Sequence, residues 1–253
     1  RFFHRLGATL LDRGPLCGIV RGTAYTSLFG TAPGMPPEQM RDADVVAVWG
    51  NNVTVSNLHL ARVIKAAREN GARLVVIDPK RTKIAEQAHL YLQIRPGTDV
   101  VLALALAAEL ERRGAFDRAF LDAWVEGLDA YMGEARGHSV DEALTVCGIT
   151  RPSFDRLADL YAGAKRLALS VGNGMERGRS GGSAIRAIMA LNVLTGQLGR
   201  PGAGVFARPG LAFPTTGARL QRPDLVPAGT RTVNIVDVGR LLLDPTLDPP
   251  IKA

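Results

Sequence analysis

The chain has 253 residues, of which 46% are hydrophobic and 22% charged, so it can bury a substantial core in one large domain or two small ones. Its formal net charge of +7 comes from Lys and Arg scattered among acidic residues, which is typical of a mildly basic solvated surface or of a protein with an acidic or phosphate-bearing ligand. The sequence shows no basic run with interleaved aromatics that would indicate nucleic-acid binding, no apolar run long enough for membrane insertion, and no signal peptide.

Two cysteines, Cys17 and Cys147, stand far apart and form neither a CxxC metal motif nor a disulfide framework. Any iron-sulfur or zinc centre is therefore expected outside this chain. The sequence starts at Arg1 without an initiator Met and ends at Ala253 without a capping element, so we expect a fragment of a longer protein.

The first half of the chain predicts alternating strands and helices. Residues 1–16 have the apolar spacing of a short amphipathic helix broken by Gly14-Pro15, and the small-residue segment that follows Ile19 and continues to Pro37 is expected to be irregular. Apolar runs predict strands buried on both faces, as in a parallel sheet, at 45–49, 74–77, 90–94 and 167–171. Helical periodicity follows these strands, and Thr98 is a suitable N-cap for an apolar helix over 99–108.

The second half predicts helices without obvious chemistry and then a change in composition. Over 116–165 the apolar positions, including Phe116, Phe120 and Trp124, are expected in the core, and His138 and Cys147 are interpreted as structural or surface residues. A helix ending near Leu198 precedes a Pro/Gly-rich tail, which indicates a boundary near residue 200. We expect a doubly wound, mostly parallel α/β domain over 13–200, the end of a preceding domain over 1–12, and a truncated return to a neighbouring domain over 201–253.

Each predicted strand ends in small or polar residues. Carboxyl ends of parallel strands share one sheet edge, so these turns should converge on one crevice. Carboxylates there can accept hydrogen bonds from a base or ribose, and backbone N–H groups at glycine turns can bind phosphate. The turns predict a nucleotide site built from Gly50/Asn52, Asp78/Lys80/Arg81, Gly97/Asp99 and Gly172/Gly174. The absence of a G-x-G-x-x-G fingerprint argues against an NAD-dependent dehydrogenase.

Four segments resemble the dimethyl sulfoxide reductase superfamily of molybdenum or tungsten oxidoreductases, which bind two pterin guanine dinucleotides. They are Trp49-Gly50-Asn51-Asn52, Val76-Ile77-Asp78-Pro79-Lys80, Arg95-Pro96-Gly97-Thr98-Asp99, and the stretch from Leu194 to Gly204. The last is the most specific, because a helix ending in L-T-G-x-x-G-x-P-x-A-G has no generic structural reason to recur. The resemblance covers most of the chain.

The resemblance implies roles for individual residues. Gly50, Asn52, Asp78, Gly97 and Asp99 would hold one guanine dinucleotide, with Gly172 and Gly174 at the same edge and Lys80 where the family often has Arg. Cys17 lies 33 positions before Gly50, where the family places its metal ligand, and a thiolate suits a soft-leaning metal already held by dithiolene sulfurs. Arg186 matches an arginine that in many members orients an anionic substrate, or else it is a surface or pterin-contacting residue.

The implied activity is two-electron oxidation or reduction, of the oxo-transfer type, of a small substrate. Gly18 replaces the His of the formate dehydrogenase branch, which disfavours formate oxidation, and Cys17 disfavours a Ser-ligated sulfoxide reductase. An electron-transfer subunit or domain is the expected partner, and a [4Fe-4S] cluster would belong to sequence before Arg1. The alternative is a metal-free nucleotide-binding or structural module of a larger redox complex.

Overall fold

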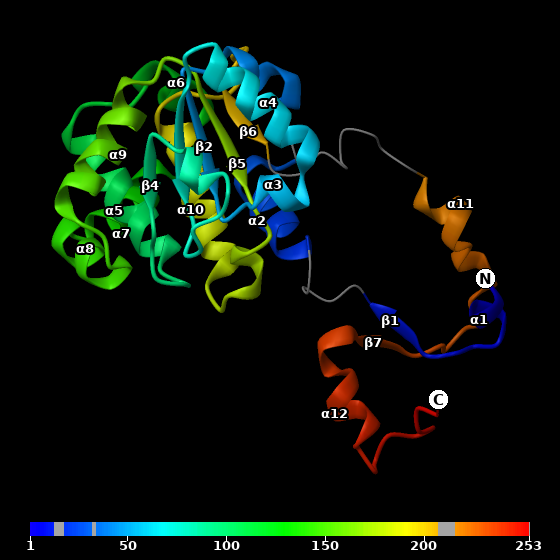
Figure 1. Ribbon diagram of the computed structural model, residues 1–253. Helices are drawn as coiled ribbons and strands as arrows, with labels where there is room; N and C mark the ends of the chain where they lie inside the picture. Colours follow the sequence, from blue (N-terminus) through cyan, green and yellow to red (C-terminus); the bar gives the residue numbers. More distant parts are fainter. Residues whose placement is uncertain (13–17, 32–33, 207–215, 253) are drawn as a thin grey trace.

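The computed structural model describes residues 1–12, 18–31, 34–206 and 216–252, most of them arranged around one parallel sheet (Figure 1). Within these ranges the sheet has five strands in the order β4-β3-β2-β5-β6. They are β2 (Val45–Trp49), β3 (Arg73–Ile77), β4 (Leu90–Leu92), β5 (Leu167–Val171) and β6 (Gly204–Phe206). The first strand of this sheet along the chain, β2, lies in the middle, so the strand order reverses between β2 and β5. Open α/β sheets bind ligands at such a switch point.

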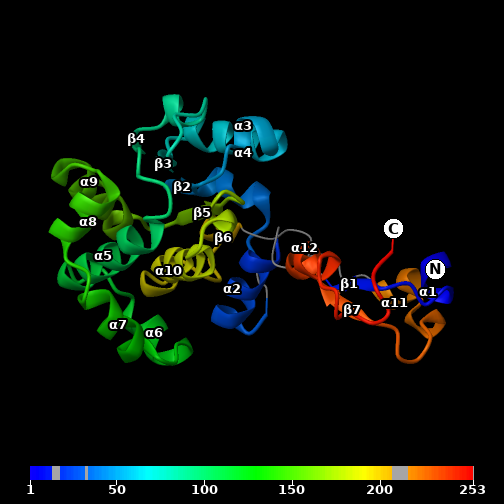
Figure 2. The same cartoon turned by 90° about the horizontal axis from the view of Figure 1, so that it is seen from below.

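Helices cover both faces of the sheet, which confirms the doubly wound α/β class. Side chains of β2 alternate between two cores, with Trp49 and Ala47 in one and Val46 and Val48 in the other. Figure 2 shows α3 and α4 on one side of the sheet and α2, α5 and α10 on the other. No described helix is long and apolar enough to cross a membrane.

The described helices vary from single turns to fourteen residues. They are α1 (Phe2–Arg5), α2 (Ile19–Phe29), α3 (Val53–Ser56), α4 (Leu58–Glu69), α5 (Asp99–Arg112), α6 (Arg118–Trp124), α7 (Leu128–Arg136), α8 (Val140–Cys147), α9 (Arg151–Gly163), α10 (Gly181–Leu194), α11 (Gly217–Gln221) and α12 (Val238–Leu242). The predicted apolar helix after residue 98 is confirmed as α5, which buries residues 102–107 against α10 and the sheet. Thr98 occupies its N-cap position, but its hydroxyl donates to Arg95 O instead of capping the helix.

The expectation of irregular backbone up to Pro37 is wrong for α2. This helix begins at Ile19 and ends at Phe29, although Gly and β-branched residues give it low intrinsic propensity. Its buried residues Gly22, Ala24 and Tyr25 lie on the sheet side, where α2 packs against α10. Tertiary packing therefore overrides local preference here.

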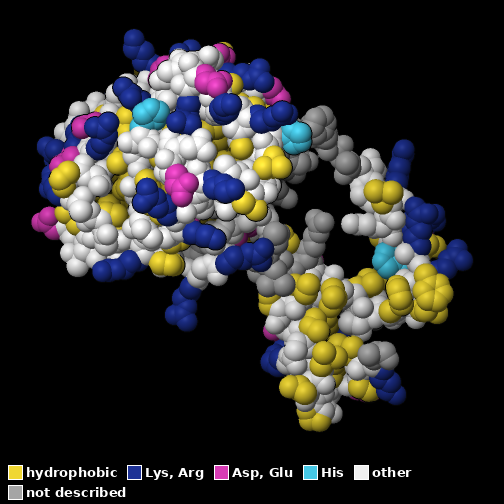
Figure 3. All heavy atoms as spheres, in the orientation of Figure 1, with side chains coloured by type: hydrophobic (Ala, Val, Ile, Leu, Met, Phe, Trp, Pro, Cys, Tyr) yellow, Lys and Arg dark blue, Asp and Glu magenta, His cyan; other side chains and the backbone are white. Residues whose placement is uncertain are grey.

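The predicted N-terminal helix is also only partly correct. The helix α1 is one turn, and the chain then extends into β1 (Leu10–Asp12), which pairs in parallel with β7 (Thr232–Asn234). These strands join the first residues to the C-terminal segment. Large apolar side chains of this smaller part are exposed, as the yellow atoms in Figure 3 show; they include Phe2, Phe3, Leu6, Leu220 and Leu243.

Two further expectations need correction. Trp124 is 78% exposed, so its predicted place in the core is wrong, whereas Phe116 is buried as predicted. The helix α6 contacts the core through buried Leu121 and partly buried Phe120, and Trp124, its last residue, lies beyond this contact. The predicted boundary near residue 200 falls before β6, so the sheet extends to Phe206.

Two buried amides, one just before residues 194–204 and one within them, tie this part of the chain to the sheet. Buried Gln197 accepts a hydrogen bond from Leu167 N at 2.9 Å and donates to Ala164 O at 3.1 Å. Buried Asn192 donates to Leu167 O at 3.2 Å and Gly204 O at 3.1 Å. These two amides therefore fasten the end of α10 to β5 and β6.

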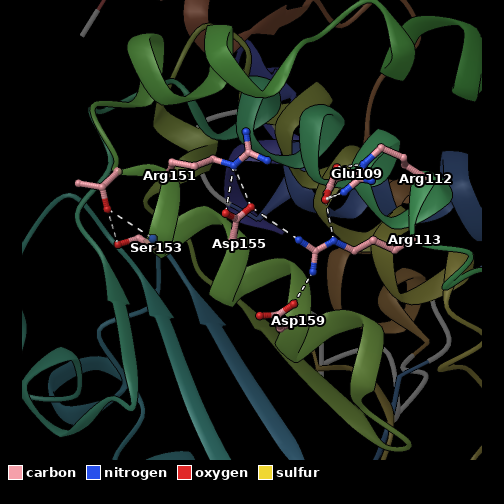
Figure 4. A network of polar contacts seen from close by, with 8 residues as sticks. Glu109, Arg112, Arg113, Arg151, Ser153, Asp155 and Asp159 are labelled. Atoms are coloured by element: carbon pink, nitrogen blue, oxygen red, sulfur yellow. Dashed lines mark hydrogen bonds and ion pairs between the residues drawn. The ribbon is translucent and has the colours of Figure 1, made fainter.

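A network of charged side chains connects α5 to α9 on the same face of the sheet (Figure 4). The Glu109 side chain is 3% exposed and accepts from Arg112 Nη2 and Arg113 Nε, each at 2.6 Å. Arg113 also pairs with Asp155 and Asp159 on α9. Hydrogen bonds from Arg112, and then Arg113, lower the pKa of Glu109 to about 2 despite its burial.

We expect Glu109→Gln to lower the free energy of unfolding at pH 7 by about 1–3 kcal/mol, because two guanidinium groups lose a charged acceptor. The folded-state pKa of Glu109 lies below its usual 4.5, so this contribution is complete above pH 4.5 and is lost as the pH falls toward about 2. Thermal unfolding monitored by circular dichroism across this pH range measures the effect.

Glu69→Gln, which removes an exposed partner of Lys65 on α4, is the matched control, and its effect should stay below about 1 kcal/mol. Equal destabilisation by both variants would contradict a special role for the Glu109 network.

Candidate functional site

The turns after β2 and β5 touch at the switch point of the sheet. Trp49 and Val171 are paired at the ends of these strands, and Gly172 N donates to Trp49 O at 2.9 Å. A Cβ atom on Gly172 would stand 1.9 Å from Gly50 O, so this contact leaves no space for a side chain. Gly50 itself has φ +57°, in the left-handed region that glycine adopts easily. The sequence therefore permits two strand ends to meet backbone to backbone.

A cavity of about 310 Å³ lies on one side of this contact. It brings together three of the predicted turns and the segment that follows β5. Its lining includes the predicted residues Gly50, Asp78, Gly97, Asp99 and Gly174, with Pro79, Pro96, Met175, Arg177, Ser180 and Gly181 added by the structure. The predicted convergence on one crevice is thus observed in the geometry for these residues.

Two nearly buried carboxyl groups line this cavity. Asp99, the first residue of α5, is 8% exposed and accepts a 2.8 Å hydrogen bond from the indole Nε1 of Trp49. Asp78 is 9% exposed and accepts from Lys80 N at 2.8 Å. Burial raises the pKa of both carboxyl groups, while the bonds from Trp49 and Lys80 N oppose that shift. Each carboxyl is held in place and keeps lone pairs for a ligand with N–H groups.

A second cavity, of about 240 Å³, lies on the other side of Gly50. Gly172 and Asn52 line it, as does Arg21 from α2. The Asn51 amide donates to Ser170 Oγ at 2.9 Å, and the Asn52 side-chain oxygen accepts from Thr54 Oγ1 at 3.0 Å. Together the two cavities place glycine backbone and both Arg and Asp side chains at one sheet edge.

Sequence reasoning missed the pair formed by Arg21 and Glu176. Glu176 lies in the 3₁₀ turn Met175–Arg177, and its side chain is fully buried. The two residues are 155 positions apart, and no local pattern links them. The available signal was the concentration of charge in Glu176-Arg177 directly after a predicted ligand-binding turn.

The structure does not place four of the predicted site residues at these cavities; one of them, Arg81, is exposed and lines neither. Cys17 falls outside the described residues. Lys80 is exposed and lines neither cavity, although its backbone N–H orients Asp78. Arg186 is exposed on α10 beside Tyr131 and also lines neither cavity. Within the described ranges, no group of three or more His, Cys, Asp or Glu side chains could hold a metal ion.

The fold and the site geometry define a parallel α/β protein with a divided crevice at its switch point. A family model described as molybdopterin oxidoreductase matches residues 18–235. The chain therefore belongs to the molybdopterin oxidoreductase family, whose members carry a molybdenum or tungsten pterin cofactor.

Similar proteins support this assignment. The chain is 31% identical over its whole length to "Probable oxidoreductase YoaE" of Bacillus subtilis, of which it covers 37%. It is 28% identical over 77% of its length to a nitrate reductase of Synechocystis, of which it covers 28%. Acetylene hydratase from Pelobacter acetylenicus shares the fold over 75% of this chain and 26% of that one, with a TM-score of 0.65 and 23% identity. The chain thus spans little more than a third, or less, of these relatives.

Gly172→Ala should destabilise the protein by about 2–4 kcal/mol and enlarge the distance between the two turns, because the new methyl group overlaps Gly50 O. Thermal unfolding gives the first effect. Gly174→Ala in the same turn is the control, since its Cβ would stand 3.4 Å from that oxygen. Similar melting temperatures for both variants would show that the close approach is not needed.

Proposed function

We propose that this chain is the cofactor-binding part of the catalytic subunit of a molybdenum or tungsten oxidoreductase that binds two pterin guanine dinucleotides. The observation that carries the proposal is the pair of buried, fixed carboxyl groups, Asp78 and Asp99, facing a cavity beside the Gly50–Gly172 contact in a chain of this family. A guanine base presents adjacent N–H donors, which a carboxylate accepts. The glycine turn at Gly97, where a Cβ would meet no atom within 4 Å, lets a phosphate chain approach the backbone.

In this proposal each residue has a limited task. Asp99, held by Trp49, accepts from the base, and Asp78 accepts from the base or ribose. Backbone N–H groups at Gly97 and Gly174 bind phosphate, and Asn52 contacts the same dinucleotide. Gly50 and Gly172, whose N–H groups donate to Ile77 O and Trp49 O, shape the turns that the dinucleotide contacts. Arg186 contacts an anionic substrate or a pterin. The bound cofactor would supply two-electron redox chemistry, and the Cys17 thiolate would be the protein ligand to its metal.

The proposed substrate is a small oxyanion, sulfur compound or similar molecule, in either redox direction. Gly18 follows the proposed metal ligand where the formate dehydrogenase branch has His, so formate is disfavoured, although formate dehydrogenases of Escherichia coli and methanogens are among the relatives. Relatives called subunit alpha, such as that of Methanocaldococcus jannaschii, are in keeping with an electron-transfer partner.

The full-length protein, purified without oxygen, should contain molybdenum or tungsten and release two guanine nucleotides per metal on hydrolysis. Asp99→Asn should lower the guanine content about 10- to 100-fold, because a charged acceptor is lost. Asp122→Asn, at an exposed position of α6, is the control and should leave it unchanged. Active protein without metal and pterin would refute the proposal.

The variant Cys17→Ala distinguishes a molybdenum or tungsten oxidoreductase from the alternative, a metal-free nucleotide-binding or structural module. If Cys17 is the metal ligand, the variant should keep its pterin and lose turnover. Unchanged turnover, measured with the substrate on which the wild-type protein acts, would contradict the ligand role.

The Trp49 hydrogen bond lowers the pKa of Asp99 against the effect of burial. Trp49→Phe should therefore raise that pKa further, and the binding of GDP to cofactor-free protein should be lost at a higher pH than in the wild type. Calorimetric titrations across the acid range measure the midpoint. Trp124→Phe, at a position 78% exposed, is the control. Identical midpoints in all three proteins would exclude Asp99 as the titrating acceptor.

A further inference from the structure

We infer that Arg21 and Glu176 form a positioning pair that fixes the start of α2 against the turn after β5. The structural part of this inference concerns described residues alone. Its functional part, that the pair thereby limits where the Cys17 thiolate can lie, rests on the proposed function.

The pair is buried and doubly connected. The Glu176 side chain has no exposed area, and that of Arg21 is 16% exposed. Glu176 Oε2 accepts a hydrogen bond from the backbone N of Arg21 at 3.2 Å, and Oε1 lies 3.5 Å from Arg21 Nε. One carboxylate therefore contacts both the backbone and the side chain of the same residue.

The backbone contact replaces a missing helix cap. The N-cap residue of α2 is Gly18, which has no side chain to accept from the first-turn N–H groups. Arg21 is the third residue of α2, and its N–H is one of those donors. A carboxylate at this end is also favoured by the helix dipole. Glu176 thus caps α2 from 155 positions away.

The side chain of Arg21 completes the connection to the sheet. Its Nη1 donates to Val171 O at 3.1 Å, at the end of β5. The same side chain lines the cavity that Gly172 and Asn52 share. Arg21 is therefore joined both to the strand end and to the turn that follows it, so the first turn of α2 cannot move away from Gly172 without breaking these contacts.

The consequence for the metal ligand follows from covalent geometry. Cys17 precedes Ile19, the first residue of α2, by two positions, which span at most about 7 Å of extended backbone. A fixed helix start therefore limits how far the Cys17 backbone can lie from the first turn of α2, which Arg21 joins to Val171 O. Glu176 and Arg21 act on it through the backbone and need not touch the metal.

The test uses the full-length protein with Glu176→Gln, Arg21→Gln and the double variant. Hydrogen exchange of the amides in α2 reports the helix start, pterin analysis reports the dinucleotide, and X-ray absorption counts sulfur neighbours of the metal. Lys65→Gln and Glu69→Gln, which break an exposed ion pair on α4, are matched controls.

Each single variant should speed amide exchange in the first turn of α2 about 10- to 100-fold. Glu176→Gln removes the charged acceptor, and Arg21→Gln leaves the buried carboxylate without its guanidinium partner. The double variant should change exchange by less than the product of the two singles, because neither charge is left alone. The mean number of sulfur neighbours at the metal should fall while pterin content is unchanged.

Unchanged amide exchange rates in α2, or a double-variant effect equal to the product of the two single effects, would contradict the proposal that Arg21 and Glu176 act together. Faster exchange with an unchanged number of sulfur neighbours at the metal would contradict the positioning role. A wild-type protein without metal and pterin would refute the proposed function and the link to Cys17, whereas the exchange data would still decide whether the pair fixes α2.

Discussion

The backbone contact between Gly50 and Gly172 is the constraint on which the rest of the site depends. Because β2 and β5 are neighbours in register, their following turns must leave the sheet at the same place. A side chain on Gly172 would collide with Gly50 O. The touching turns leave two cavities at this sheet edge, one with the carboxyl groups and the other with Arg21.

Buried polar contacts then orient the surrounding side chains. Trp49, at the end of β2, connects the sheet to Asp99 at the start of α5, and Arg21 connects the end of β5 to Glu176. The helix α5 therefore carries a site residue at its first position and Glu109, with its two arginines, near its end. Moving either end of α5 would break a buried polar contact, at one end the Trp49–Asp99 hydrogen bond and at the other the pairing of Glu109 with its arginines. Such a movement is unfavourable because buried polar and charged groups are costly when they lose their partners.

Four of the five described strands of the sheet were predictable because they are continuous apolar runs, and three of them ended within a residue of the expected positions. The short strand β6 lies in the Gly-rich segment after residue 200 and was not predicted. The convergence of the turns was predictable once the strands were assigned, because the carboxyl ends of parallel strands lie at the same edge of a sheet. The helix α2 and the Arg21–Glu176 pair were not predictable, because packing on α10 and a contact across 155 positions decide them. The segment ending at Gly204 was singled out from its sequence, and within it Gln197 fastens the start of β5 to Ala164, the residue that follows α9.

The central claim is that the cavity lined by Asp78 and Asp99 holds the guanine of a pterin dinucleotide. An experimental structure of the intact, cofactor-loaded protein tests it most directly. The account predicts a guanine base within hydrogen-bond distance of the Asp99 carboxylate, with phosphate oxygens against the turns at Gly50 and Gly172. A bound dinucleotide whose guanine lies elsewhere, with this cavity filled by solvent or by side chains, would contradict it.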